Sequence, residues 1–293
     1  MFVRVSAAIL GLALFAAGTR GHAAGLELRE VTARVVVVAE PRSDVKVTVL
    51  TTNPALPLTI SRTDDGGALV DGRSEHRRDW LSWIMHPQLV QCRGREGHDD
   101  QLPSLLVRVP LDADIRASGM VIGSLPTAQS LELHTAGCGG WTIGHVTGRF
   151  ELEDAGADNV RAGDVGELKA HLSGAGKVTV RNVVAGLEVH LAGASDVKAG
   201  QVSGPIELHI AGHGDVDLGP GHSSHMSVEI AGQGDVAYAG VVERLDVSIA
   251  GQGDVSVAQV TGSVNKSVAG QGTVTIGGVR KTTAGLGVDH SDN

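Results

Sequence analysis

Aspartates recur at nearly equal intervals in the C-terminal half of the chain, and their type and spacing could serve chemistry. Each follows Ala-Gly-x-Gly or Ala-Gly-x-Ser, and the series comprises Asp196, Asp215, Asp235 and Asp254. Such carboxylates could bind calcium through oxygen ligands or supply the acid and base of a polysaccharide-cleaving enzyme. Alternatively, each Asp accepts hydrogen bonds from the backbone of a turn. Lys177 and Thr273 fill the same position in flanking units, which favours a tolerant turn position over a cation site or catalysis.

Histidines recur at a second position, and imidazoles on neighbouring units could bind a metal ion. They are His134, His171, His190 and His209, and other units have Glu153, Glu229 or Ser248 there. Because this position alternates with apolar residues, it is expected on a solvated strand face, and we predict no metal site. A third series consists of the glutamines Gln233, Gln252 and Gln271. Their side-chain amides can hydrogen-bond to one another along a stack of coils, so this series is interpreted as structural.

A repeat defines the elements that must position these residues. The first glycine of each unit recurs every 18 to 20 residues, at Gly137, Gly156, Gly174, Gly193, Gly212, Gly232, Gly251 and Gly270. So constant a period is typical of a solenoid. In the unit that begins at Ile206, apolar and polar residues alternate on both sides of Gly-x-Gly, which predicts a strand, a corner and a shorter strand.

The corner is predicted to be architectural, because backbones must come close there or adopt positive φ. The structural corner residues are Gly193, Gly212, Gly232, Gly251 and Gly270. The fold class is therefore all-β: a parallel β-helix of about 19 residues per coil, preceded by a less regular β-rich segment. The hexapeptide pattern of left-handed β-helices is absent, which favours a right-handed one. Coils would stack about 4.8 Å apart.

Composition and the N-terminus indicate an exported protein. The net charge of −9 argues against a nucleic-acid partner, which requires a basic face. Residues 1–24 resemble a secretory signal peptide, with Arg4 before an apolar run that is too short to span a membrane. No later segment is long and apolar enough for a span. We expect a β-rich segment with a cap over residues 25–129, regular repeats over 130–278 and a polar tail over 279–293.

One stretch breaks the alternating pattern, "SEHRRDWLSWIMHPQLVQCRG", which begins at Ser74. Aromatic rings beside cations could face a glycan, a lipid headgroup or a protein partner, and the candidate binding residues are Arg77, Arg78, Trp80 and Trp83. Alternatively, this stretch covers the open end of the coil stack, whose strand edges would otherwise be exposed. Trp141 is predicted to fill the inward position that Val takes in later units.

The repeat Ala-Gly-x-Gly-Asp-Val, opened by "LELHTAGCGGWTIGHVTG" and closed by "SVAGQGTVTIGG", resembles the GIN-domain family. Those exported bacterial proteins are labelled putative auto-transporter adhesin heads. The resemblance extends upstream through "VTARVVVVAEPRSDVKVTVL" and covers nearly all of the mature chain. It implies a right-handed β-helix in the cell envelope and brings no catalytic residue.

We therefore expect a non-enzymatic protein of the periplasm or cell surface, a structural or adhesin-like binding module without a cofactor. Its partner would be an envelope component or a glycan, and self-association through solenoid ends or faces remains open. The sequence has no Gly-x-Ser-x-Gly, His-Glu-x-x-His or phosphate-loop motif. The alternative is a carbohydrate-active enzyme, a lyase or hydrolase, because β-helix scaffolds host both functions.

Export also makes the cysteines informative, because an oxidising compartment favours disulfides. Cys92 and Cys138 are the only two in the chain, so we predict that they are joined. Closing a loop of about 46 residues would stabilise the fold by roughly 4 kcal/mol in the chain-entropy model. Alkylation of the unreduced mature protein followed by mass spectrometry should find no free thiol. Two alkylated cysteines would contradict the pairing.

Overall fold

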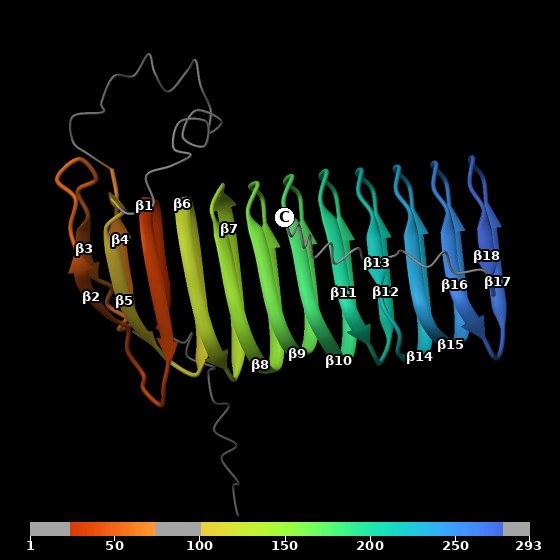
Figure 1. Ribbon diagram of the computed structural model, residues 1–293, viewed down its shortest axis with the longest axis horizontal. Coiled ribbons are helices and arrows are strands. Elements are labelled where there is room, and N and C mark those ends of the chain that lie inside the picture. The colour runs from red at the N-terminus through yellow and green to blue at the C-terminus, as the bar shows by residue number, and fades with distance from the viewer. Residues whose placement is uncertain (1–23, 74–100, 278–293) are drawn as a thin grey trace, which may run out of the picture.

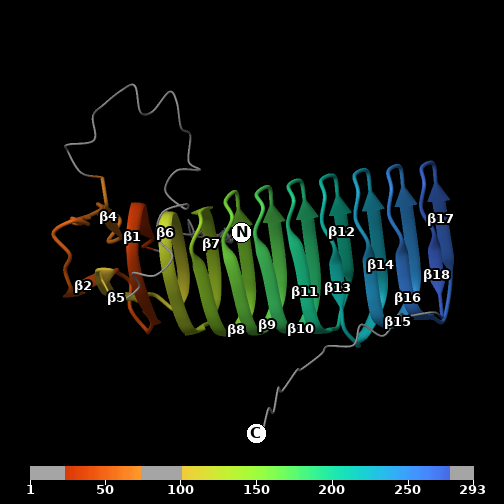
Figure 2. The ribbon, with the colours of Figure 1, turned by 45° about the horizontal axis from the view of Figure 1, so that its top comes forward.

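The computed structural model describes residues 24–73 and 101–277, and every regular element in these ranges is a β-strand. The strands stack side by side along one long axis (Figures 1 and 2). Nearly all pairings are parallel, between strands about one repeat apart in the sequence. This confirms the predicted all-β solenoid with coils of about 19 residues, whereas its right-handed sense stays a prediction. Among the described residues no helix could cross a membrane.

The strands are, in chain order, β1 (Leu26–Ala39), β2 (Lys46–Thr51), β3 (Thr59–Arg62), β4 (Ala68–Asp71), β5 (Ser104–Val109), β6 (Asp112–Ala128), β7 (Ser130–Gly137), β8 (Gly140–Asp154), β9 (Asn159–Leu172), β10 (Lys177–Leu191), β11 (Asp196–Val202), β12 (Ile206–Ile210), β13 (Val216–Leu218), β14 (His222–Ile230), β15 (Val236–Ile249), β16 (Val255–Val260), β17 (Val264–Val268) and β18 (Val274–Ile276).

One coil shows how the alternating pattern becomes a core. β12 and β13 are separated by the corner, and β12 pairs in parallel with β10 before it and β14 after it. Leu208 therefore lies between Val189 and Val228, and all three are fully buried. The residues that alternate with them along each strand, such as Glu207 and His209, face outward. The core is a set of such aliphatic ladders, in which successive side chains are about one strand spacing apart.

The corner brings backbone against backbone between successive coils. A Cβ added at Gly251 would overlap the carbonyl oxygen of Gly232, and the same holds for each first glycine of the repeat against its predecessor. That carbonyl oxygen also accepts a hydrogen bond, at 3.0 Å, from the backbone N–H of Gln252. Close approach is therefore what requires glycine at this position. Positive φ, the other predicted reason, is not found at Gly251 or Gly232.

Variation in coil length is confined to turns outside the corner. The 18-residue unit is shortened at the turn after Val165, where the pairing of β8 with β9 shifts register. The 20-residue unit is lengthened between Leu218 and His222. Because these turns absorb the difference in coil length, the aliphatic ladders on either side of the corner keep their alignment.

Two large aromatic side chains fill the interior where neighbouring glycines leave room. Trp141 is 2% exposed and stacks above Val160, the inward position predicted for it. A Cβ at Gly123, its partner in β6, would overlap the indole ring. Tyr238 is also buried, and its hydroxyl donates a hydrogen bond to the Val202 carbonyl oxygen at 3.0 Å. Burial raises the pKa of Tyr238 to about 12.

The N-terminal end of the rod is closed differently from the rest. β1 pairs in parallel with β6 on one side and with β4 and β5 on the other. β2 then pairs antiparallel with β5, and β3 antiparallel with β4. These strands lie at one end of the stack (Figure 1). They cover the edge that the first parallel coil would otherwise expose.

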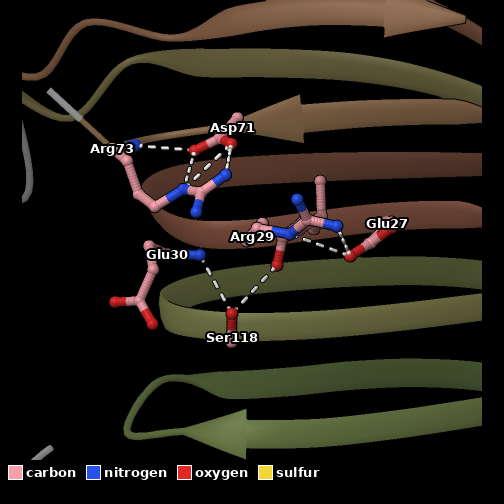
Figure 3. A network of polar contacts seen from close by, with 7 residues as sticks. Glu27, Arg29, Glu30, Asp71, Arg73 and Ser118 are labelled. Atoms are coloured by element: carbon pink, nitrogen blue, oxygen red, sulfur yellow. Dashed lines mark hydrogen bonds and ion pairs between the residues drawn. The ribbon is translucent and has the colours of Figure 1, made fainter. Parts of the chain in front are cut away.

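The corner of β1 lacks the glycine ladder and is held by polar contacts (Figure 3). β1 shifts register against β6 between Leu28 and Val31, and Glu30 adopts a φ of 51° in this bulge. The Ser118 hydroxyl oxygen accepts a hydrogen bond from the Glu30 backbone N–H at 2.9 Å. This contact ties the strained residue to the next coil.

Two short-range ion pairs flank the same bulge (Figure 3). The Arg29 guanidinium lies 2.6 Å from a Glu27 carboxylate oxygen. Arg73 donates hydrogen bonds to both carboxylate oxygens of Asp71. The Arg73 hydrogen bonds lower the pKa of Asp71 to about 2. Both ion pairs are partly exposed and therefore add little to the free energy of folding. We infer that they mainly fix the local conformation of the bulge.

The C-terminal end, formed by β17 and β18, presents an uncovered coil among the described residues. Val264, Val268 and Ile276 are 39%, 43% and 43% exposed. Lys266 pairs with Val247 and thus takes an inward position that is aliphatic in the preceding coils. Its side chain is exposed because no described coil follows.

Gly251→Ala should destabilise the solenoid strongly, by about 4 kcal/mol or more. The added methyl group meets backbone atoms of Gly232 and Ala231, which cannot rotate away. Chemical denaturation measures the free energy of unfolding, and hydrogen exchange should show opening first in the adjacent coils.

Asp254→Asn is the matched control for this substitution. Its remaining carbonyl oxygen can still accept the hydrogen bonds from Thr273, so its cost should stay under about 1.5 kcal/mol. Equal stability of Gly251→Ala and the parent protein would show that the corner tolerates a side chain.

Candidate functional site

An outward-facing row of polar side chains runs along the solenoid just before the corner; we call it the imidazole column. The strand register places neighbours in this order: Arg116, His134, Glu153, His171, His190, His209 and Glu229. The repeat predicted the part from His134 onward, and the register confirms that alignment. Arg116 extends the column into the coil that precedes the regular repeats.

Three of its histidines stack ring on ring. The ring centroids of His171 and His190 are 4.6 Å apart with an interplanar angle of 11°. His190 and His209 are also 4.6 Å apart, at 12°. Parallel pairing at one strand spacing imposes this arrangement, because equivalent side chains on adjacent coils have the same direction.

A glutamate accompanies the histidine on three strands, in the pattern Glu-x-His. Residues two apart on a strand share a face, so the pairs are Glu132 with His134, Glu188 with His190, and Glu207 with His209. His190 Nε2 lies 2.9 Å from Glu188 Oε1.

Hydrogen bonds shift the pKa of His209 in this row and of Glu188 beside it. The Glu207 hydrogen bond is the main cause that raises the pKa of His209, with Glu229 adding to it and burial opposing it. Burial favours a higher pKa for Glu188, but hydrogen bonds from His190 and Lys169 outweigh it and lower that pKa. The raised pKa favours the cationic form of His209, and the lowered pKa favours the anionic form of Glu188.

A groove of about 570 Å³ follows the N-terminal part of the imidazole column. Its lining comes from β1, β6, β7, β8, β9 and β10, with neighbouring corner residues. Five steps between adjacent coils correspond to a length of about 24 Å. His134, His171 and His190 supply hydrogen-bonding groups, and small residues such as Ala136 and Ala155 also line the groove. Such a shape fits an extended chain better than a compact ligand.

Two buried aspartates lie in the corner of β8 and β9, and the sequence analysis missed both. Asp154 is 1% exposed and Asp158 is 2% exposed. Asp154 pairs with Leu172 and so replaces an inward aliphatic residue. Asp158 occupies the position of Gly139 and Gly176 in adjacent coils, which is inferred from the pairing of the next residue. The signal in the sequence that could have indicated both residues is their departure from the repeat, since an aspartate stands where the next unit has an aliphatic residue or a glycine.

The hydrogen bonds of the two aspartates differ. Asp158 accepts from the backbone N–H groups of Gly139 at 2.6 Å and Gly137 at 3.1 Å. Asp154 Oδ1 accepts from Gly156 N–H at 2.7 Å and from the Thr135 hydroxyl at 3.1 Å. Asp154 Oδ2 is buried without a hydrogen-bond partner among the described residues.

Burial is the main cause that raises the pKa of both carboxyl groups, and the negative charge of Asp158 raises that of Asp154 further. A raised pKa alone could indicate a general acid of a glycosidase. A carboxyl group that acts on a substrate must reach it, however, and Asp154 and Asp158 are only 1% and 2% exposed, although Asp154 borders the groove. We therefore assign both aspartates a structural role.

The Asp series lies outside the corner and forms a continuous chain of hydrogen bonds. Each backbone N–H donates to the carboxylate of the preceding coil: Asp215 to Asp196 at 3.2 Å, Asp235 to Asp215 at 2.9 Å, and Asp254 to Asp235 at 2.8 Å. One oxygen of each of these carboxylates, Oδ1, thus accepts a backbone hydrogen bond from the next coil. This geometry supports the turn interpretation, with the donor one coil away.

The other predicted series are also placed by the register. The Gln series forms backbone bridges from coil to coil, and Gln233 Nε2 donates to Gln252 Oε1 at 3.2 Å. The predicted corner glycines stack in one column, as described above. Cys138 lies between β7 and β8, whereas Cys92 and the candidate binding residues Arg77, Arg78, Trp80 and Trp83 lie outside the described residues. The disulfide and that binding segment stay predictions.

Stacked coils, glycine corners and an outward polar column define the class: a parallel β-solenoid with a long surface groove. Residues 184–280 match the family described as "Putative auto-transporter adhesin, head GIN domain". The match confirms, over these C-terminal coils, the resemblance seen in the sequence.

Among solved structures, the chain is similar to a putative adhesin from Parabacteroides distasonis ATCC 8503. The two share 14% sequence identity at a TM-score of 0.45, and the alignment covers 86% of this chain and 91% of that chain. A likeness of this size carries no functional argument, so the fold rests on the strand register. No curated protein matches the sequence.

Asp154→Asn should stabilise the protein at neutral pH. A buried acid with a raised pKa is more favourable protonated, so its contribution to stability falls as pH rises from the ordinary Asp pKa through the raised one. The amide removes the buried charge and keeps an oxygen for the Gly156 N–H and Thr135 hydroxyl. Urea denaturation should show a gain near pH 7 that shrinks toward pH ~4.

Asp196→Asn, at an exposed position of the Asp series, serves as the control for the amide substitution and should show no gain in stability near pH 7. A loss of stability at pH 7 for Asp154→Asn would mean that the ionised carboxylate is required in the folded protein.

Proposed function

We propose that this protein is an exported, non-enzymatic, adhesin-like binding module of the cell envelope, and that the groove along the imidazole column holds its partner. The observation that carries the proposal is the groove itself, which crosses six strands of successive coils. The family match supports a binding role. Removal of residues 1–24 as a signal peptide, and a location in the periplasm or on the surface, are part of the proposal.

The lining favours a polar, extended polymer such as a glycan. Imidazole and carboxylate groups on one row can donate and accept hydrogen bonds with hydroxyl groups. Small side chains such as Ala136 and Ala155 let a flat sugar ring approach the strands closely. A nucleic acid is disfavoured because the chain carries a net charge of −9.

A carbohydrate-active enzyme is the second candidate, and the raised pKa values of Asp154 and Asp158 are the observation in its favour. Their burial argues against it, as given above. Incubation with envelope polysaccharides should release no reducing or unsaturated ends, which separates binding from cleavage.

Ala155→Trp should abolish binding, because Ala155 is an exposed groove residue and an indole there would obstruct the channel. The mature protein would first be screened on arrays of glycans and purified envelope components. A component bound by the parent should then lose at least about tenfold affinity for the variant, or 1.4 kcal/mol.

Val184→Trp is the matched control, since Val184 is 63% exposed and lies in β10 outside the groove lining. It should bind like the parent protein. The proposal would be overturned if the parent bound no component, or if Ala155→Trp bound as tightly as Val184→Trp.

A further inference from the structure

We infer that His171, Glu188 and His190 form a binding site for a transition metal ion such as Zn²⁺. Their candidate ligand atoms, two imidazole nitrogens and a carboxylate oxygen, all lie within 4.8 Å of one another. Two histidines and one carboxylate are a donor set that zinc takes in proteins, with a fourth position left for water or another ligand. The inference does not depend on the identity of the groove's partner.

The fold supplies this arrangement from two adjacent strands. β9 and β10 pair in register, which places His171 directly beside His190. Glu188 lies two residues before His190 on the same face of β10. All three side chains are half-buried, so their backbones are fixed while their outer atoms stay accessible to an ion from solvent.

Binding requires the rings of His171 and His190 to turn out of their stack, because the lone pairs of two nearly parallel rings do not point at one ion. A tetrahedral ion with bonds of about 2.0–2.1 Å would bring its ligand atoms to roughly 3.4 Å from one another. Rotation of the two rings about their side-chain bonds can supply a change of about 1 Å. His190 Nε2 and Glu188 Oε1 are joined by a hydrogen bond of 2.9 Å, which the ion would replace with a bond to each group.

His171 distinguishes this cluster from the rest of the column. Within the described residues no hydrogen bond or ion pair engages its ring nitrogens, and its contact is the stacking with His190. His209, by contrast, has both ring nitrogens occupied, by Glu229 at 3.0 Å and by Glu207 at 2.9 Å. A metal ion at His209 would therefore have to displace two charge-assisted hydrogen bonds.

A second cluster of candidate ligands, Asp114, Glu132 and His134, is less suited. His134 Nδ1 lies 2.7 Å from Glu153, and Asp114 is paired with Arg116 at 3.4 Å. This cluster also offers one nitrogen and two carboxylates, a set with less preference for zinc than two imidazoles.

Lys169 tunes the proposed site. Its ammonium lies 3.2 Å from Glu188 Oε1. It competes with the metal for this carboxylate and repels a divalent cation. Removal of the ammonium charge should therefore strengthen metal binding, an effect that a merely structural lysine would not produce.

The site differs from the Asp series in the class of ion. Carboxylates of that series accept backbone hydrogen bonds from the next coil, whereas the three ligands here include two imidazole nitrogens, which suit zinc better than calcium.

Isothermal titration of the chelator-treated, full mature protein with zinc sulfate tests the inference. The parent should bind one ion, and His171→Gln/His190→Gln should weaken binding by more than about 100-fold. His145→Gln/His222→Gln removes the same number of histidines at exposed positions elsewhere and should bind like the parent. Lys169→Gln should bind more tightly than the parent.

Cobalt substitution and a milder variant keep the test decisive if the double variant fails to fold. Glu188→Gln removes the carboxylate ligand alone and should weaken zinc binding by at least about tenfold. The Co²⁺ protein should show visible absorption of a four-coordinate site that Glu188→Gln alters. Absence of zinc binding by the parent would overturn the inference, as would equal zinc affinity of the parent and the ligand variants.

Discussion

The structure depends on one contact: the backbone of each coil resting against the backbone of the coil before it at the glycine corner. The carbonyl oxygen of one glycine occupies the space where a Cβ of the next would lie. The same oxygen accepts a hydrogen bond from the residue that follows the next glycine, as between Gln271 and Gly251 at 2.9 Å. Steric exclusion and hydrogen bonding thus select glycine together, and the aliphatic ladders on both sides keep their alignment because this contact is repeated.

The outward chemistry inherits its spacing from that contact. Since adjacent coils are one strand apart, any residue type that recurs in the repeat becomes a row along the rod. The histidines stack at 4.6 Å, and the aspartates pass hydrogen bonds from coil to coil. A groove and a cluster of possible metal ligands arise on the same row, because His171 and His190 belong to both. Recognition and metal binding would then share one face of the molecule.

The regular coils could be predicted from the sequence because their signals are local and repeated. The alternation around Ile206 gave strand, corner and strand, and the structure has β12, a glycine corner and β13 in these places. The site was harder to predict, since the groove depends on side-chain volumes across six strands that no single unit contains. Asp154 and Asp158 could not be predicted from the repeat, because they depart from it at positions that are aliphatic or glycine in the next coil. The antiparallel strands β2 and β3 lie before the repeat begins, so no periodicity indicated them.

Lys266 has a consequence for how the molecule avoids becoming a fibre. Every coil is a template for the next, and the last described coil, in which Val264 and Val268 are exposed, would invite another molecule to add its strands. A second molecule that docked there would have to bury the Lys266 ammonium in a row that is otherwise aliphatic, which is unfavourable without a partner charge. At the opposite end, β2 runs antiparallel to β5 and β3 runs antiparallel to β4. Their edges therefore present a different hydrogen-bonding pattern from that of a parallel coil. The two tips therefore do not match, and polymerisation of rod upon rod is discouraged at each of them.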